Sequence, residues 1–151
     1  MNRKLITYYF LPALAFLSFS CDFSDNYYPK GDYISGYITF VDTNFMSSGG
    51  YYAVALYSNQ SSPYNSIPLT TDTLKIAGAT SPYNYRIYYE NKSACFLGII
   101  WKRTTSESEI PRVLGTYGCD TSYSCTDFKS INFPNFTGAN YDVICWTDTT
   151  H

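Results

Sequence analysis

Cysteine is the residue type in this chain whose positions say most about its chemistry. The chain has five cysteines, and an odd number calls for an explanation in an exported protein, because disulfide bonds use thiols in pairs. Cys21 stands apart from the others, since it directly follows a short apolar segment near the N-terminus. If Cys21 does not take part in a disulfide bond, four cysteines remain that could pair: Cys95, Cys119, Cys125 and Cys145.

Cys119 and Cys125 lie in the stretch GTYGCDTSYSCTDF, which is rich in Gly, Ser, Thr and Asp and places five residues between the two cysteines. Closing so short a loop would stabilise the fold by about 2 kcal/mol through chain entropy, and we predict a local disulfide here. Cys95 and Cys145 lie in the strand-like runs SACFLGIIWK and DVICWTD. They could bridge neighbouring strands, or they could remain two buried free thiols.

No metal, cofactor or catalytic site is expected from the remaining reactive side chains. Cysteine-based metal sites need C-x2-C spacing and usually His partners, and neither is present. The one histidine is His151, and a chain end is a poor position for a general base that must be held close to its proton. Glycoside hydrolysis by two carboxylates about 5 to 10 Å apart is the remaining enzymatic alternative. The candidates for such a pair are interpreted more simply as solvated loop or turn residues: Asp42, Asp120, Asp127, Asp148, Glu107 and Glu109.

Residues 1–20 have the layout of a secretory signal peptide. Arg3 and Lys4 give a positive start, and the run from Leu5 to Phe19 is uncharged and mostly Leu, Phe, Tyr and Ala. A transmembrane helix needs about 20 apolar residues, so this run is short for a span, and Pro12 interrupts it. A signal that is cleaved, or that leads to a lipid anchor, fits the pattern better.

The residues before Cys21 resemble the lipobox of bacterial lipoproteins, with small side chains at Ser18 and Ser20. Leu17 lies one place upstream of the usual leucine position in that pattern. The resemblance implies that a diacylglycerol is attached to Cys21 through a thioether and that the signal is cut just before it. The alternative is an ordinary signal peptide cleaved near Ser20, which would leave Cys21 as a spare thiol.

A lipid anchor would attach the protein without a spanning segment, because two or three acyl chains hold a protein stably at a bilayer. We expect a bacterial cell-envelope location, periplasmic or surface-exposed, with the outer membrane favoured; Asp22 also allows retention at the inner membrane. The chain then divides into a signal peptide at 1–20, the lipidated cysteine and a polar tether at 21–32, and one folded domain at 33–151.

The composition excludes one class of partner and favours one class of fold. Without Arg3 and Lys4, the ten Lys and Arg residues become eight against twelve Asp and Glu, a formal charge of 8 − 12 = −4. Nucleic acid is therefore not an expected partner, since a basic patch is the usual mark of such binding. Aromatic residues make up 19% of the chain and charged residues only 15%, a balance that favours β structure.

Alternating apolar and polar residues predict strands from Tyr33 onward. In YISGYITFVD, the apolar Ile34, Ile38 and Phe40 point to one side, whereas ACFLGIIWK is apolar on both sides and predicts a central strand covered on both faces. Helical periodicity is absent. The predicted strands fall within 33–42, 51–58, 67–76, 83–90, 94–102, 112–117, 130–133 and 140–148. We predict an all-β fold, a single antiparallel sandwich of about seven or eight strands.

Three segments, SGYITFVD, YYAVALYS and PNFTGANYDVICWTD, are similar to the prealbumin-like (transthyretin-like, carboxypeptidase-regulatory-like) sandwich of bacterial envelope proteins. The similarity spans residues 33–148 and implies an accessory or binding role. An immunoglobulin-like sandwich would have much the same strand count. The tetrapeptide SPYN, at 62–65 and again at 81–84, is interpreted as two copies of a turn-forming sequence.

The main functional hypothesis is a membrane-anchored, non-catalytic interaction module, and a carbohydrate-binding module that uses exposed Tyr and Trp is the alternative. Tyr and Trp carry sugar stacking and protein hot spots, although most of the 17 tyrosines are expected to be structural. Loops on a rigid scaffold carry function more often than strands do, so the predicted ligand surface is the loop 104–108 together with the loop 118–126. Tyr117 and Tyr123 are its exposed aromatic candidates. The expected partner is an envelope or extracellular protein, or a glycan bound by a carbohydrate-binding module.

Overall fold

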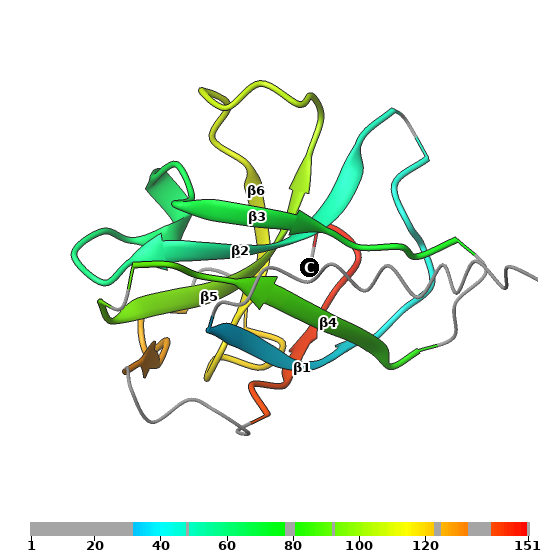
Figure 1. The fold of residues 1–151 in the computed structure, drawn as a ribbon. Helices are drawn as coiled ribbons and strands as arrows, with labels where there is room; N and C mark the ends of the chain where they lie inside the picture. Colours follow the sequence, from blue (N-terminus) through cyan, green and yellow to red (C-terminus); the bar gives the residue numbers. More distant parts are fainter. Residues whose placement is uncertain are drawn as a thin grey trace, which may run out of the picture.

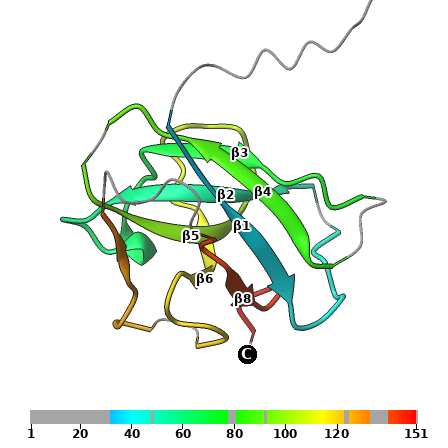
Figure 2. The same ribbon diagram turned by 60° about the horizontal axis from the view of Figure 1, so that its bottom comes forward.

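Two packed β-sheets make up the structure, a computed structural model that describes residues 32–47, 49–77, 81–91, 93–122, 125–132 and 140–150. The three-stranded sheet has the order β4 (Tyr83–Tyr88), β1 (Tyr33–Phe40) and β8 (Val143–Cys145). The five-stranded sheet has the order β3 (Thr70–Thr73), β2 (Tyr51–Ser58), β5 (Cys95–Lys102) and β6 (Arg112–Thr116), and β7 (Ser130–Ile131) also pairs with β5. The sheets form two layers, one lying across the other (Figures 1 and 2). The predicted all-β sandwich is confirmed.

One strand pairing departs from the predicted antiparallel arrangement. β1 and β8 run parallel, with Ile38 opposite Val143 and Phe40 opposite Cys145. The other strand pairs of the described residues are antiparallel. A parallel pair cannot be joined by a tight hairpin and needs a long connection. Here the connection is the rest of the domain, which brings the first and the last described strands side by side.

The helical content of the described residues is one 3-10 turn, η1 (Pro63–Asn65), between β2 and β3. Proline suits the first position of such a turn, because its φ is already near the helical value and its missing N–H would be unpaired there in any case. No helix in this part of the chain is long and apolar enough to cross a membrane.

The main core lies between the two sheets. In β1 the burial alternates as the sequence pattern predicts, with Ile34, Ile38 and Phe40 on the inside. Val54 of β2 and Ile99 of β5 belong to the same cluster on the facing sheet. Burying an aliphatic side chain of this size stabilises the folded state by about 1.5–3 kcal/mol, so this layer supplies most of the driving force for folding.

The five-stranded sheet is buried on its outer face as well, which agrees with the predicted two-sided burial of β5. A second cluster of buried residues lies on this face: Ala53, Ala55, Tyr57, Ile100 and Val113. Tyr64 of η1 and Phe96 of β5 pack against that cluster. The outer face of the three-stranded sheet is open by comparison, since Tyr37 is 44% exposed and Ile144 is 41% exposed.

A hydrogen-bonded clamp holds the end of β1 to the segment that follows β8. The Asp42 carboxylate accepts the Thr147 backbone N–H at 2.9 Å and the Thr147 hydroxyl at 2.8 Å. The hydroxyl of Tyr52, in β2, donates to the Thr147 carbonyl and accepts the Met46 N–H, both at 2.8 Å. Partial burial raises the pKa of Asp42, but the bonds from Thr147 outweigh burial and hold the pKa below its ordinary value. The clamp therefore joins strands of both sheets.

Candidate functional site

The loop closed by Cys119 and Cys125, here called the cystine loop, has the predicted disulfide, with the two Cα atoms 6.0 Å apart. The backbone turns sharply as it enters this loop, since Gly118 has a φ of 92°, a value that glycine adopts at no steric cost. At the base of the loop, the Lys129 N–H donates to the Tyr117 carbonyl at 2.9 Å. The loop is therefore held both by a covalent bond and by a backbone hydrogen bond.

η1 forms a wall opposite the cystine loop. Its Asn65 N–H donates to the Ser62 carbonyl at 3.3 Å and closes the turn. The Tyr64 ring lies 6.4 Å from the ring of Phe128, just after the cystine loop, at an angle of 60°. Phe128 in turn packs edge-on against Phe96 of β5, with the ring centroids 4.6 Å apart. These aromatic contacts connect the turn, the loop and the sheet below them.

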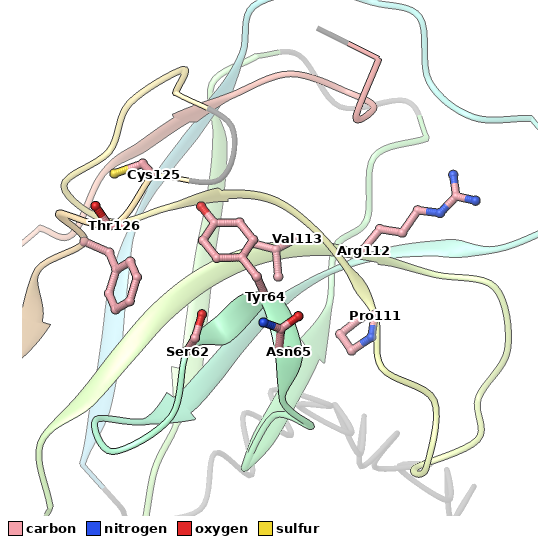
Figure 3. Close-up of a pocket in the computed structure, with 9 residues that line it drawn as sticks. Ser62, Tyr64, Asn65, Pro111, Arg112, Val113, Cys125 and Thr126 are labelled. Carbon is pink, nitrogen blue, oxygen red and sulfur yellow. The ribbon is translucent and has the colours of Figure 1, made fainter.

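An open cavity of about 510 Å³ lies between these two walls, on the outer side of the five-stranded sheet (Figure 3). We call it the cystine-loop cavity. Its walls come from η1 and the cystine loop, and its floor comes from the start of β6. Its lining residues are Ser62, Tyr64 and Asn65, then Cys125, Thr126 and Phe128, and on the floor Pro111, Arg112 and Val113. A volume of this size falls within the range of small-molecule sites, roughly 300 to 1,000 Å³.

The lining of the cystine-loop cavity is polar but nearly uncharged. Arg112 is the only charged residue among the nine that line it. The Arg112 guanidinium lies over the Trp101 ring, 5.4 Å from its centroid, and Figure 3 shows this side chain extending away from the other labelled residues. The remaining polar side-chain groups are the hydroxyls of Ser62, Tyr64 and Thr126 and the amide of Asn65, each of which can both donate and accept hydrogen bonds.

The loop between β5 and β6 contains the other predicted ligand segment, 104–108. The Glu109 carboxylate organises this loop by accepting two backbone N–H groups, at 3.1 and 3.0 Å, and the Thr104 hydroxyl. The hydroxyl bond from Thr104 is the main cause that lowers the pKa of Glu109. Lys102, only 4% exposed, donates to the Ser106 carbonyl at 2.7 Å. Hydrogen bonds therefore connect the start of the loop, residues 102–104, to Ser106 and Glu109.

A second cavity, of about 420 Å³, lies beside this loop. Lys102 and Glu107 line it together with residues 67–71, so it contains charges of both signs. Two of its apolar lining residues, Ile67 and Leu69, are each 50% exposed. Each loop singled out from the sequence therefore borders a cavity, and the two cavities differ in charge.

Tyr117, expected among the exposed aromatic candidates, is half-buried and packs edge-on against Tyr141, with the ring centroids 5.3 Å apart. The reason is the alternation of side chains along a strand. Thr116 pairs with Gly98 and points to the outer face, so the next side chain, that of Tyr117, turns toward the main core. Tyr123, the other aromatic candidate, lies outside the described residues.

The aromatic wall of the cystine-loop cavity comes instead from Tyr64 and Phe128, which the sequence pattern did not single out. A usable signal was present in the first SPYN copy, 62–65, which forms η1, whereas the second copy, 81–84, leads into β4. Because proline fixes the backbone of such a turn, the aromatic residue after it has a defined direction.

Three of the six candidate carboxylates, those of Asp42, Glu109 and Asp148, accept hydrogen bonds from nearby groups. Of the six, only Glu107 lines one of the described cavities. Asp42 is bound by Thr147, and Asp148 accepts the backbone N–H and the hydroxyl of Thr150 at 3.0 and 2.8 Å. Within the described ranges, no three His, Cys, Asp or Glu side chains are grouped so that they could hold a metal ion.

Cys95 and Cys145 are free and fully buried. Of the two predicted alternatives, a disulfide between strands or two buried free thiols, the structure has the free thiols. Burial raises the pKa of the Cys95 thiol to about 12 and also raises that of Cys145, where the charge of Asp42 adds to the effect. A thiol must ionise to become a good nucleophile, so these two side chains act as packing residues. A Cβ at Gly115 would lie only 2.6 Å from the Cys145 Cβ, which shows how closely the sheets approach there.

Similarity to characterised proteins gives no assignment for either cavity. No family model matches the chain. No curated protein and no solved structure is significantly similar to it.

Proposed function

We propose that this protein is a bacterial envelope lipoprotein, anchored through Cys21, whose sandwich is a non-catalytic binding module. The observation that carries the proposal is the position of Cys21, which follows a signal-like apolar run and is separated from β1 by the polar segment 22–32. Cys21 itself lies outside the described residues. A lipid on this cysteine would hold the sandwich at a membrane without a spanning segment.

The prealbumin-like class of the sandwich belongs to the same proposal, and two packed sheets are compatible with it. The binding role is supported by the two cavities beside the predicted loops. Binding rather than catalysis is supported by the carboxylates, three of which accept local hydrogen bonds, and by the two buried thiols with raised pKa values. The proposed partner is an envelope or extracellular protein or a glycan, with the outer membrane favoured as the location and Asp22 allowing the inner membrane.

Fatty-acid labelling and membrane fractionation test the anchor. The native protein, Cys21→Ser and the control Ser24→Ala are each expressed in a bacterial host that is fed an alkyne-labelled fatty acid. We expect the native protein and the control to carry the label and to sediment with membranes. Cys21→Ser should lose the label and become soluble or accumulate as the precursor, because the thioether cannot form.

Protease treatment of intact cells then locates the sandwich. Digestion of the native protein would place the sandwich on the cell surface, and protection would place it in the periplasm. If the native protein carries no label and Cys21→Ser fractionates as the native protein does, the lipoprotein proposal is wrong and the chain is an exported domain with one spare thiol.

A further inference from the structure

We propose that the cystine-loop cavity binds a neutral saccharide. This inference rests on the proposed binding role of the sandwich and names the ligand class of one of its cavities. It does not depend on the lipid anchor, so the two proposals can fail separately.

The aromatic walls of the cavity suit one side of a sugar ring. A pyranose presents C–H groups on its faces and hydroxyls around its edge, so it packs best where a flat apolar surface lies beside polar groups. Tyr64 and Phe128 supply ring surfaces, and both are half-buried rather than enclosed. Their mutual contact at 6.4 Å and the packing of Phe128 on Phe96 hold the rings in place.

The polar groups of the cavity suit the edge of a sugar ring. Ser62, Asn65 and Thr126 are exposed and line the cavity from both walls. Their hydroxyl and amide groups donate and accept hydrogen bonds, as the hydroxyls of a sugar do, so one ring can be bound through several bonds of mixed direction.

The charge of the cavity decides between neutral and charged ligands. No carboxylate is among its nine lining residues, so a cationic ligand has no ion-pair partner there. The one cationic side chain, Arg112, lies over Trp101 and extends away from the other labelled residues in Figure 3, so an anionic ligand gains little from it. The second cavity, which contains Lys102 and Glu107, differs in this respect. The cystine-loop cavity therefore favours an uncharged ligand.

The described parts of both walls are also held by bonds within the chain. The disulfide between Cys119 and Cys125 closes one wall, and the Asn65–Ser62 backbone bond closes the other. A preformed site spends less of its binding free energy on ordering its own loops, which matters for a ligand held by a few hydrogen bonds.

Calorimetric titration of the full chain in detergent tests this inference. The neutral probes are cellohexaose, maltohexaose, laminarihexaose and mannohexaose, and the charged probe is an oligogalacturonate. Asn65→Ala removes a cavity amide, and Asn84→Ala removes an exposed amide from β4 on the three-stranded sheet as the matched control. A second pair, Thr126→Val and Thr39→Val, repeats the comparison for a hydroxyl. All four positions are exposed, so each variant should fold.

We expect at least one neutral hexasaccharide to bind, with roughly tenfold weaker affinity in Asn65→Ala and unchanged affinity in Asn84→Ala. The inference is overturned if no neutral probe binds at millimolar concentration, or if only the oligogalacturonate binds. It is equally overturned if both asparagine variants behave alike, because the bound sugar would then lie elsewhere. If a saccharide binds and Cys21→Ser fractionates as the native protein does, the anchor proposal is wrong and the cavity proposal stands. If no saccharide binds and Cys21→Ser leaves the membrane, the cavity proposal is wrong and the anchor proposal stands.

Discussion

The outer face of the five-stranded sheet carries a second packed layer, whereas the outer face of the three-stranded sheet is open to solvent. Tyrosine occurs on both faces in different roles. On the open face, the Arg86 guanidinium lies 4.3 Å from the centroid of the Tyr33 ring, and Tyr33 meets Tyr88 edge-on at 6.1 Å. On the covered face, Tyr64 packs on the second cluster and frames a cavity.

The difference between the faces shows that residue type alone does not identify a binding surface. A strand face with solvent above it leaves its tyrosines to stack on each other or on arginine. A strand face with a turn and a loop above it can enclose a volume. The covering segments η1 and the cystine loop, rather than the number of tyrosines, create the cystine-loop cavity.

The largest effect is expected from a substitution in the second cluster, on the outer face of the five-stranded sheet. Two matched isoleucines, one on each outer face, test it. Ile100→Ala should lower the free energy of unfolding by about 3 kcal/mol, because Ile100 is fully buried in the second cluster. Ile144→Ala should lower it by less than about 1 kcal/mol, because that side chain is 41% exposed. Urea unfolding measures both, and equal losses would mean that the outer layer is not truly packed.

Removing the disulfide should have the next largest effect. The double variant Cys119→Ser/Cys125→Ser loses the loop constraint on the unfolded chain, which should cost about 2 kcal/mol of stability. It should also weaken saccharide binding, since Cys125 lines the cavity. Treatment with a reductant is the control, because Cys95 and Cys145 are already free thiols. The reductant should lower the stability of the native protein and leave that of the double variant unchanged.

The clamp between Asp42 and Thr147 should have a smaller, pH-dependent effect on both sheets together. Asp42→Ala should cost about 1 kcal/mol at neutral pH, since the carboxylate is partly solvated and its bonds are correspondingly weakened. The Asp42 pKa is lower in the folded chain than in the unfolded chain, so its stabilisation is fully present above the ordinary carboxyl pKa.

As the pH falls through the lower, folded pKa of Asp42, that stabilisation is lost. Unfolding curves across this acid range should therefore converge for the native protein and Asp42→Ala. Asp127→Ala, at an exposed position, is the control and should run parallel to the native protein. A constant gap between native and Asp42→Ala curves down to the lowest pH would rule out this role for the carboxylate.

The smallest expected effect has the opposite sign. The Tyr57 hydroxyl is buried on the covered face and has no hydrogen-bond partner in the described part of the chain. Tyr57→Phe should therefore stabilise the protein by up to about 1 kcal/mol, because an unsatisfied buried hydroxyl opposes folding. Tyr37→Phe, on the open face, should change nothing measurable. Destabilisation by Tyr57→Phe would reveal that the hydroxyl does have a bonding partner.

The strands and the disulfide could be predicted because their signals are local. Alternation in β1, the two-sided apolar run of β5 and the short, turn-rich stretch between Cys119 and Cys125 are each contained in a few consecutive residues. The parallel pairing of β1 with β8 could not be predicted in this way, because it depends on how two segments at opposite ends of the domain meet.

The candidate site was predictable only in part for the same reason. The loops 104–108 and 118–126 are recognisable as turn-rich segments, and each borders a cavity. The residues opposite these loops could not be predicted from the sequence. Tyr64, for example, lines the cystine-loop cavity from a turn more than fifty residues earlier in the chain. The direction of Tyr117 followed from the strand register, which the pattern alone leaves open by one residue.

The pairing of β1 with β8 has a consequence for how the chain reaches its native state. Ile38 and Val143 meet although almost the whole domain separates them, so the three-stranded sheet cannot be completed until β8 is available. Contacts of such high sequence separation slow folding, because the entropy of a long loop must be lost before the contact forms. A chain that lacks β8 would have β1 without one neighbour, so the three-stranded sheet is expected to form late in folding.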